Sequence, residues 1–343
     1  MSKMTIQVLA DHLGLSISTI SKALKDSHEI SAATKQKVLE AATELGYTPN
    51  PYASSLRKQK SKTIAVILPE ISDSFFALAV GGIESVATER QYHTLIYLTH
   101  ESFLAEKDVL KHCAGGRVDG VLISVSKETT ETTHFDTLKR ANIPFVFFDR
   151  DLEGYEANKV LTDDYRSGLI ATRHLIDQGC KYPVFISPSD SLSVCNRRYD
   201  GFKSALNNAG LPQGTENFIL VDCQNRGASL TEQLKTVLQQ NPAIDGVLAS
   251  VEDIAIHSYL ACKELNILIP DRLQIIAFTT IKTADIFSPT LTTITQPAFE
   301  TGKQAASILF DLIDKKQPKV SGAPLILPSI LTERASTKSI TRA

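Results

Sequence analysis

Residues 16–22, which read SISTISK, carry the side chains best suited to specific recognition. Their helical spacing predicts a solvent-facing surface with one branched residue, three hydroxyls and one cation: Ile17, Ser18, Thr19, Ser21 and Lys22. Short polar side chains on a helix can contact base edges in the major groove of DNA, and a lysine can contact a phosphate. A small helical bundle with no nucleic-acid role would show the same pattern, so this stretch alone leaves both interpretations open.

Residues suited to catalysis or to metal binding form no recognisable constellation. The sequence has no P-loop, no G-x-G-x-x-G after a strand, no G-x-S-x-G and no H-E-x-x-H. Asp163 and Asp164 suit a cap on the following helix better than acid–base catalysis, and His174 suits packing or the surface. The cysteines are scattered without a C-x-x-C pair, which indicates core thiols: Cys113, Cys180, Cys195, Cys223 and Cys262. We therefore predict no enzyme, no catalytic residue, no metal and no cofactor.

Three short helices must position residues 16–22. Thr5, Ser16 and Ser31 each precede apolar residues at helical spacing, so they are predicted N-caps, and Gly46 ends the third helix. A small residue where two helices cross, a glycine in the turn and a branched residue locking the second helix define a helix-turn-helix. Ala10, Gly14 and Ile20 have that spacing. The inward-facing residues would be Ile6, Leu9, Ala10, Leu13, Ile20, Ala23, Leu24, Val38, Ala41, Ala42 and Leu45.

Charge and composition separate this head from the rest of the chain. The 343 residues have a formal net charge of −2, yet residues 1–62 carry nine basic and five acidic side chains. A basic head on an acidic body favours a nucleic-acid contact confined to the head. The N-terminus lacks the apolar core of a signal peptide, and no apolar run approaches the ~18 residues that span a bilayer. We therefore expect a soluble intracellular protein with no membrane partner.

The body, residues 63–343, alternates short apolar runs with amphipathic helical stretches. The runs are TIAVILP, HTLIYLT, GVLISVS, FVFFD, PVFISP, FILVDC, GVLASV and LQIIAFT. Strands that alternate with helices indicate right-handed βαβ units and parallel sheets covered on both faces. The sequence DGVLISV at 119–125 recurs as DGVLASV at 245–251. This echo predicts two similar α/β lobes with a ligand cleft between the carboxyl ends of their strands.

The segment between head and body, YTPNPYASSLRKQKSK at 47–62, could be a tether or a working part. Asn50 can cap a helix and Pro51 can occupy its first position, so residues 50–57 carry a helix start signal. About two turns of isolated helix are unstable in water. We therefore expect this segment to order only together with a partner.

These features together resemble the lactose/galactose-repressor (LacI/GalR) family of bacterial transcriptional regulators. The head is similar over residues 5–58, and the body supplies FFDR at 147–150, VLTDDYRSG at 160–168, RYDGF at 198–202 and LTTITQP at 291–297. The resemblance implies an all-α helix-turn-helix domain (1–48), a hinge helix or linker (49–62) and a two-lobed α/β domain like periplasmic binding proteins (63–343). The lobes would comprise approximately 63–164 with 291–322, and 165–290 with 323–335.

The resemblance also implies function: a cytoplasmic, nucleoid-associated homodimer that binds a near-palindromic double-stranded operator and responds to a small, sugar-like metabolite. Ile17, Ser18 and Lys22 match the family's base-reading positions. The positions that match phosphate contacts or the hinge are Thr5, Ser16, Thr19, Ser21, Ser31, Tyr47, Asn50, Ala53 and Arg57, and Leu56 matches the wedge that enters the minor groove.

The effector residues implied by the resemblance lie in both lobes. They are Phe75, Phe76, Ser124, Asp149, Arg150, Arg198, Glu252, Thr279 and Gln296, with Arg197 a weaker alternative to Arg198. Packing in the core is an equally good interpretation of the two phenylalanines. The family commonly has a carboxylate where this chain has Thr279, and Asn-Asp where it has Glu252-Asp253. We interpret this as one pocket carboxylate that has moved across the cleft. We expect a sugar-like ligand to be retained, with its hydroxyls bound differently.

Two other classes of protein share parts of this pattern. A cytoplasmic sugar- or nucleoside-binding protein of the periplasmic type would have the same body, but the 62-residue head argues against it. An α/β enzyme with an added helical domain would need catalytic motifs that the sequence lacks.

Overall fold

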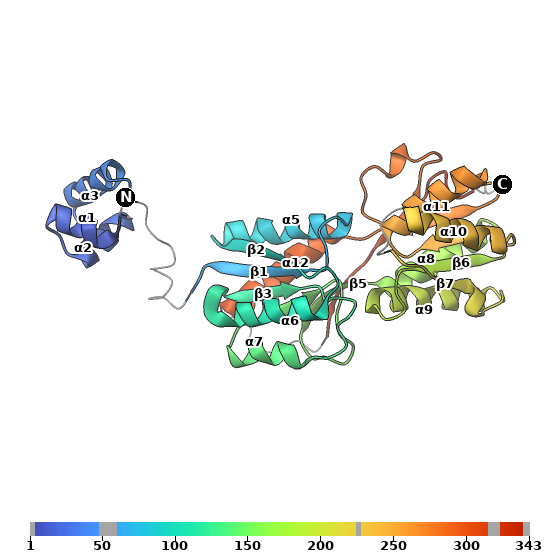
Figure 1. Ribbon diagram of the computed structural model, residues 1–343, viewed down its shortest axis with the longest axis horizontal. Helices are drawn as coiled ribbons and strands as arrows, with labels where there is room; N and C mark the ends of the chain where they lie inside the picture. Colours follow the sequence, from blue (N-terminus) through green and yellow to red (C-terminus); the bar gives the residue numbers. More distant parts are fainter. Residues whose placement is uncertain (1–3, 48–59, 224–227, 315–322, 339–343) are drawn as a thin grey trace. The chain divides into compact units, whose positions relative to one another are not determined.

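The computed structural model describes residues 4–47, 60–223, 228–314 and 323–338. Its contacts divide the chain into two compact units, Met1–Ser61 and Lys62–Ala343. The first unit is the head and the second is the body (Figure 1). No helix within the described ranges is long and apolar enough to cross a membrane.

The head consists of helices α1 (Ile6–Leu13), α2 (Ile17–Leu24) and α3 (Ala32–Glu44). The three N-caps predicted from the sequence are confirmed: Thr5, Ser16 and Ser31 each accept a hydrogen bond from the backbone N–H three residues later. Gly14 adopts a left-handed conformation, with φ of 62°, and ends α1 at the tight turn. The predicted inward faces meet in one small core, where Leu9, Ile20 and Val38 are completely buried.

The first lobe of the body is built on a six-stranded parallel sheet in the order β11-β5-β4-β3-β1-β2. Its elements are β1 (Thr63–Leu68), α5 (Ser74–Glu89), β2 (His93–Leu98), α6 (Phe103–His112), β3 (Gly120–Ile123), α7 (Asp136–Arg140), β4 (Phe145–Phe148), β5 (Asn158–Thr162), α12 (Ala298–Ile313) and β11 (Leu325–Leu327), with helical turns at Cys113–Arg117 and Thr133–Phe135. Helices α5 and α12 cover one face, and α6 and α7 cover the other.

The second lobe repeats this arrangement with the order β12-β10-β9-β8-β6-β7, in which only β12 runs antiparallel to its neighbour. Its elements are α8 (Asp164–Asp177), β6 (Pro183–Ser187), α9 (Ser193–Asn208), β7 (Phe218–Leu220), α10 (Ala228–Gln240), β8 (Gly246–Ala249), α11 (Glu252–Leu265), β9 (Gln274–Phe278), β10 (Thr292–Thr295) and β12 (Ile330–Thr332), with helical turns at Thr215–Asn217 and Ala284–Ile286. Helices α8 and α9 pack on one face, and α10 and α11 on the other.

The chain crosses between the lobes after β5, after β10, and between β11 and β12. The approximate lobe limits drawn from the sequence differ here, because β10 (292–295) pairs within the second sheet and β11 (325–327) within the first. Both strands are short, with three residues in β11 and four in β10, and β10 has one apolar residue, so neither gives a sequence signal for the sheet that it joins.

The internal echo is confirmed as a structural repeat. The strands β3 and β8 occupy the same fourth position in their sheets and are buried along their whole length. The aspartate before each strand accepts backbone N–H groups from the residues that lead into a neighbouring strand: Asp119 from Lys62, and Asp245 from Lys181 and Tyr182. In both copies of the repeat, the aspartate therefore aligns two parallel strands at their start.

The helices α8 and α9 approach so closely that glycine is required where they cross. A Cβ atom at Gly168 would lie 2.1 Å from the carbonyl oxygen of Arg198, and one at Gly201 would lie 2.0 Å from that of Tyr165. Because both clashes are with backbone atoms, neither can be relieved by a side-chain rotation. Gly168 thus fixes the position of the Arg198 backbone.

We predict that Gly168→Ala destabilises the body by ~1–3 kcal/mol or more, because the added methyl forces α8 and α9 apart. Urea unfolding of the purified variant measures this effect. Gly115→Ala is the matched control, since a Cβ at Gly115 meets nothing within 4 Å. Equal stabilities for the two variants would contradict the close helix contact.

Candidate functional site

The first half of α2 presents the predicted DNA-reading residues to solvent. Ile17, although apolar, is 37% exposed, and Ser18 and Lys22 are exposed as well. The Ser16 hydroxyl, which caps the helix, lies 2.7 Å from the Ser18 hydroxyl and 2.8 Å from that of Thr19. An exposed isoleucine can contact a thymine methyl, and the neighbouring hydroxyls can contact base edges. The positive end of the helix dipole at the start of α2 can face a phosphate.

Lys22 forms an ion pair with Glu29, which lies in the loop between α2 and α3. Both side chains are about half exposed, at 49% and 53%, so the contact is solvated. Lys35 on α3 forms a similar pair with Asp26 at 2.6 Å, and this pair lowers the pKa of Asp26. Lys22 and Lys35 are therefore each held by a neighbouring carboxylate.

The predicted phosphate-contacting residues fall into two groups. Thr5 and Ser31 are exposed caps, whereas Thr19, Ser21 and Tyr47 are half-buried. Tyr47 packs against the head's core, and its partial burial raises the pKa of its phenol. The hinge residues Asn50, Ala53, Leu56 and Arg57, with the helix expected over 50–57, lie outside the described residues.

In the first lobe, predicted effector residues gather after the carboxyl ends of β3 and β4. Ser124 donates to Asp149 over 3.5 Å, and Asp149 lies 3.8 Å from the guanidinium of Arg150. Asp149 has a φ of 61°, a left-handed conformation that only glycine, asparagine and aspartate adopt readily. One Arg150 amino group donates to both carboxylate oxygens of Glu101, at 2.8 and 3.0 Å.

In the second lobe, Arg198 is almost completely buried and is held by three contacts. Its Nε donates to Asp164 at 2.8 Å, one amino group donates to the carbonyl of Ser250 at 2.6 Å, and the guanidinium lies 4.2 Å from the centre of the Phe278 ring. Arg197, its neighbour on α9, points elsewhere and pairs with Asp151 of the first lobe at 3.1 Å. The two arginines therefore have distinct surroundings.

Glu252 joins the two lobes. Its Oε2 accepts a hydrogen bond from Ser74 at 2.6 Å and another from Thr279, and Ser74 also lies 2.7 Å from the Thr280 hydroxyl. Ser74 begins α5 of the first lobe, whereas Glu252 begins α11 of the second. Glu252 follows β8 and Thr279 follows β9, and these are neighbouring strands of the second sheet, so the two positions lie on the same side of the cleft. The interpretation that a carboxylate has moved across the cleft is therefore wrong, and Glu252 instead contacts Thr279 directly. We call Ser74, Ser124, Asp149, Arg150, Arg198, Glu252 and Thr279 the inter-lobe site.

The remaining predicted effector residues are less directly placed. Phe75 and Phe76 are 5% and 2% exposed and belong to the core of the first lobe, where their rings meet edge to face. Phe76 also lies beneath the Arg150 guanidinium, 5.7 Å from it. Gln296, at the crossing after β10, donates to Thr162 at the end of β5, 3.3 Å away. Effector contacts by all nine predicted residues stay predictions.

Several residues of this site carried no sequence signal. Ser74, Glu101 and Asp164 are the partners of Glu252, Arg150 and Arg198, yet each is distant in sequence from the group it binds. Asp163 does cap α8, as predicted, by accepting from the backbone of Arg166, but Asp164 has the separate role of pairing with Arg198. His174 is buried against Thr337, which confirms packing. All five cysteines are free thiols, and no group of metal-binding side chains occurs within the described ranges.

Burial raises the pKa of Asp149 to about 7, and the nearby Arg150 and Arg198 only partly oppose it. Burial likewise raises the pKa of Asp73, the N-cap of α5, to about 6. An aspartate in the unfolded chain ionises near pH 4. Between pH 4 and 7 the folded protein therefore keeps protons that the unfolded chain has lost, and its stability must fall as the pH rises through this window.

We predict that Asp149→Asn increases the free energy of unfolding by about 2–4 kcal/mol at pH 8 and has little effect near pH 4. Asparagine tolerates the left-handed backbone at this position, so the change removes the titrating group without adding strain. Urea unfolding from pH 4 to 8 measures this gain. A smaller decrease in the free energy of unfolding with rising pH, caused by Asp73, should remain in the variant. Asp177→Asn, at an exposed position on α8, is the control. A gain that does not vary with pH would contradict the burial of a titrating carboxyl.

Comparison with known proteins agrees with this geometry. Residues 5–50 match the model of bacterial regulatory proteins of the lacI family, and residues 172–337 match a periplasmic binding protein-like domain. The HTH-type transcriptional regulator RegA of Clostridium saccharobutylicum is 30% identical over 97% of this chain and 99% of its own length.

Two solved structures are similar to the chain. A LacI family transcriptional regulator from Enterococcus faecium with bound ribose is 28% identical, with a TM-score of 0.70, and the match covers 80% of this chain and 98% of the other. The lac repressor dimer bound to operator and the anti-inducer ONPF has the same fold, with a TM-score of 0.85 over 98% of this chain and 100% of the other at 19% identity. The chain belongs to the lacI family of bacterial regulatory proteins and is a DNA-binding transcriptional regulator.

Proposed function

We propose that this regulator is a homodimeric repressor that binds a near-palindromic operator through α2 and changes its affinity when a neutral, sugar-like molecule occupies the inter-lobe site. The observation that carries the DNA half is the exposed row of Ile17, Ser18 and Lys22 on a capped helix. Two copies of one recognition helix, related by a two-fold axis, read two half-sites of a near-palindrome.

The DNA contacts divide by physical role. Ile17, Ser18 and Lys22 determine which bases are preferred, whereas Thr5, Ser16, Thr19, Ser21, Ser31 and Tyr47 contact phosphates and set the register. Phosphate contacts govern the salt dependence of binding and carry no sequence information. Lys22 must leave Glu29 to reach DNA, which costs little because both groups are solvated.

The charges of the inter-lobe site favour an uncharged effector rich in hydroxyls. Arg150 is already neutralised by Glu101, and Arg198 by Asp164, so neither arginine offers a free positive charge to a phosphate. Asp149 and Glu252 instead offer acceptor oxygens, and in this structure their donors are hydroxyls of the protein itself. A sugar can supply the same donors. The relative of known structure with bound ribose supports this chemistry for the chain.

This arrangement also explains how binding can change the lobes. Hydroxyls of a sugar would replace Ser74 or Thr279 at Glu252 and so exchange a direct contact between the lobes for one through the ligand. A ligand shifts such an equilibrium only by its difference in affinity for the two arrangements, on the order of a few kcal/mol. In the dimer, the shift would act on the paired segments at 50–57, where Leu56 enters the minor groove and Asn50, Ala53 and Arg57 contact the adjacent backbone.

We predict that changing Ser18 to Ala, or Ile17 to Thr, alters the preferred base at one position of each half-site by about 1–3 kcal/mol. Selection of binding sites from a random DNA pool measures the preference. Thr5→Ala is the control, because loss of a phosphate contact should weaken all sequences alike. Selection of an unchanged operator by the Ser18 and Ile17 variants would remove these residues from the base-reading role.

We predict that unphosphorylated sugars give heat in titration calorimetry with the full chain, and that Glu252→Gln weakens this binding by ~10-fold or more, because a charged acceptor is lost. Glu264→Gln, also on α11 but paired with Lys235 at the surface, should bind normally. Heat from phosphorylated sugars or purines alone would overturn the assignment of a neutral effector.

A further inference from the structure

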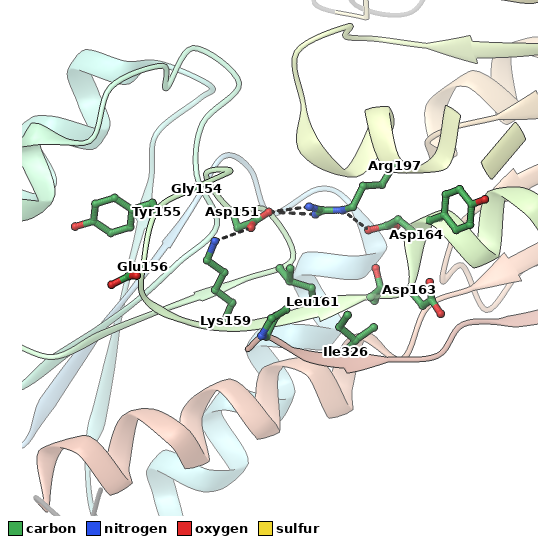
Figure 2. A pocket seen from close by; sticks show the side chains of 13 residues that line it. Asp151, Gly154, Tyr155, Glu156, Lys159, Leu161, Asp163, Asp164, Arg197 and Ile326 are labelled. Atoms are coloured by element: carbon green, nitrogen blue, oxygen red, sulfur yellow. Dashed lines mark hydrogen bonds and ion pairs between the residues drawn. The ribbon is translucent and has the colours of Figure 1, made fainter. Parts of the chain in front are cut away.

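A pocket lies beside the strands that cross between the lobes, apart from the inter-lobe site. Its volume is about 440 Å³, within the range of small-molecule sites. The first lobe contributes the loop after β4 together with β5 and β11, and the second lobe contributes the starts of α8 and α9 (Figure 2). None of the seven residues of the inter-lobe site lines it. We call it the lateral pocket.

A chain of ionic contacts runs along the polar wall of the lateral pocket. Figure 2 shows Lys159 paired with Asp151, Asp151 with Arg197, and Arg197 facing Asp164. Both amino groups of Arg197 donate to the same oxygen of Asp151, at 3.1 Å. Arg197 and Lys159 outweigh the effect of burial and lower the pKa of Asp151. Asp151 is therefore held between two cations without any ligand.

Two atoms at the inner end of this wall are not matched. Asp164, whose side chain is fully buried, uses Oδ1 for Arg198, but its Oδ2 has no hydrogen-bond partner within the described ranges. The Nε of Arg197 likewise has none there, and it lies 4.0 Å from that oxygen, too far for a hydrogen bond. A buried acceptor and a buried donor left unpaired are costly, so the site is built to receive a group between them.

The chemistry of these two atoms identifies that group. It must donate to the carboxylate and accept from the guanidinium, and a hydroxyl does both. Asp164 is paired with Arg198 and Asp151 with Arg197, which leaves Glu156 and Asp163 against Lys159, so the net charge of the lining opposes the binding of a phosphate or a carboxylate. Leu161 and Ile326 form an apolar floor opposite the polar wall. We infer that the lateral pocket binds a neutral polyhydroxylated molecule, with one hydroxyl bridging Asp164 Oδ2 and Arg197 Nε.

The pocket is lined by both lobes, so binding there is coupled to the arrangement of the two lobes. Asp164 and Arg197 belong to the second lobe, whereas Lys159, Leu161 and Ile326 belong to the first. A molecule that contacts both sets stabilises the arrangement in which they are close. Asp164 also touches Arg198, so the two sites share one buried carboxylate through its two oxygens. This inference does not depend on the inter-lobe site binding a sugar.

Methyl NMR of the full chain, labelled at isoleucine and leucine, tests the inference with D-ribose and D-glucose as probes and their 5- and 6-phosphates as anionic counterparts. A neutral sugar should shift the methyl signals of Ile326 and Leu161 saturably and leave Ile330, exposed on β12, unmoved. The phosphates should bind more weakly. Asp164→Asn should weaken the response by roughly ten-fold, since it replaces the acceptor by a donor, whereas Asp177→Asn on the same helix should not.

A second pair of variants keeps the test decisive if Asp164→Asn fails to fold. Ile326→Lys fills the pocket and should abolish the response of Leu161, and Ile330→Lys, at a similarly exposed strand position, should preserve it. Glu252→Gln should also preserve it. A response that survives Ile326→Lys but disappears in Glu252→Gln would come from the inter-lobe site and would overturn the inference. The inference would also be overturned if neither sugar shifted the Ile326 and Leu161 signals, because the two unpaired atoms would then be bridged by water alone. A stronger response to the sugar phosphates than to the sugars would overturn it as well.

Discussion

The buried ion pair between Asp164 and Arg198 is the interaction on which both proposed small-molecule sites depend. Removing either charge would leave the other unpaired in the interior, where an isolated charge costs several kcal/mol. The pair can form because Gly168 lets α8 reach the backbone of α9 at Arg198 itself. The backbone contact and the charge contact thus lie at one crossing of two helices. One oxygen of Asp164 serves the inter-lobe site through Arg198, and the other borders the lateral pocket.

At each of the three proposed recognition surfaces, which are α2, the inter-lobe site and the lateral pocket, a cation is paired with a carboxylate. In the body, Arg150, Arg197 and Arg198 are each paired with a carboxylate from another element. In the head, Lys22 is paired with Glu29. The consequences differ because the surroundings differ. In a buried pair the cation keeps its carboxylate, so a ligand can bind only through hydrogen bonds to neutral or already paired groups. In a solvated pair the cation can leave its carboxylate for DNA at little cost.

The sequence was sufficient for features that depend on local or repeated signals. Caps such as Ser16, the turn at Gly14 and the eight apolar strand runs are confirmed because each is encoded within a few residues. The strands β5, β10 and β12 are only partly apolar, and β11 is apolar but, like β12, only three residues long, so none gave a comparable signal. Side-chain partnerships between distant parts of the chain were beyond sequence reasoning. The contact of Ser74 with Glu252 depends on how the two lobes meet, and the contact of Glu101 with Arg150 depends on the strand order of the first sheet.

The solvated pairs of the head constrain how operator binding can be strong. When Lys22 leaves Glu29 to contact a base, one polar contact replaces another, and the carboxylate remains close to the DNA. In the proposed homodimer two heads would act on one DNA molecule, and joining two binding modules strengthens binding without any new contact. Repression by such a dimer would then depend on whatever holds the two heads at the spacing of the operator, and the lobes of the body could govern that spacing without touching DNA.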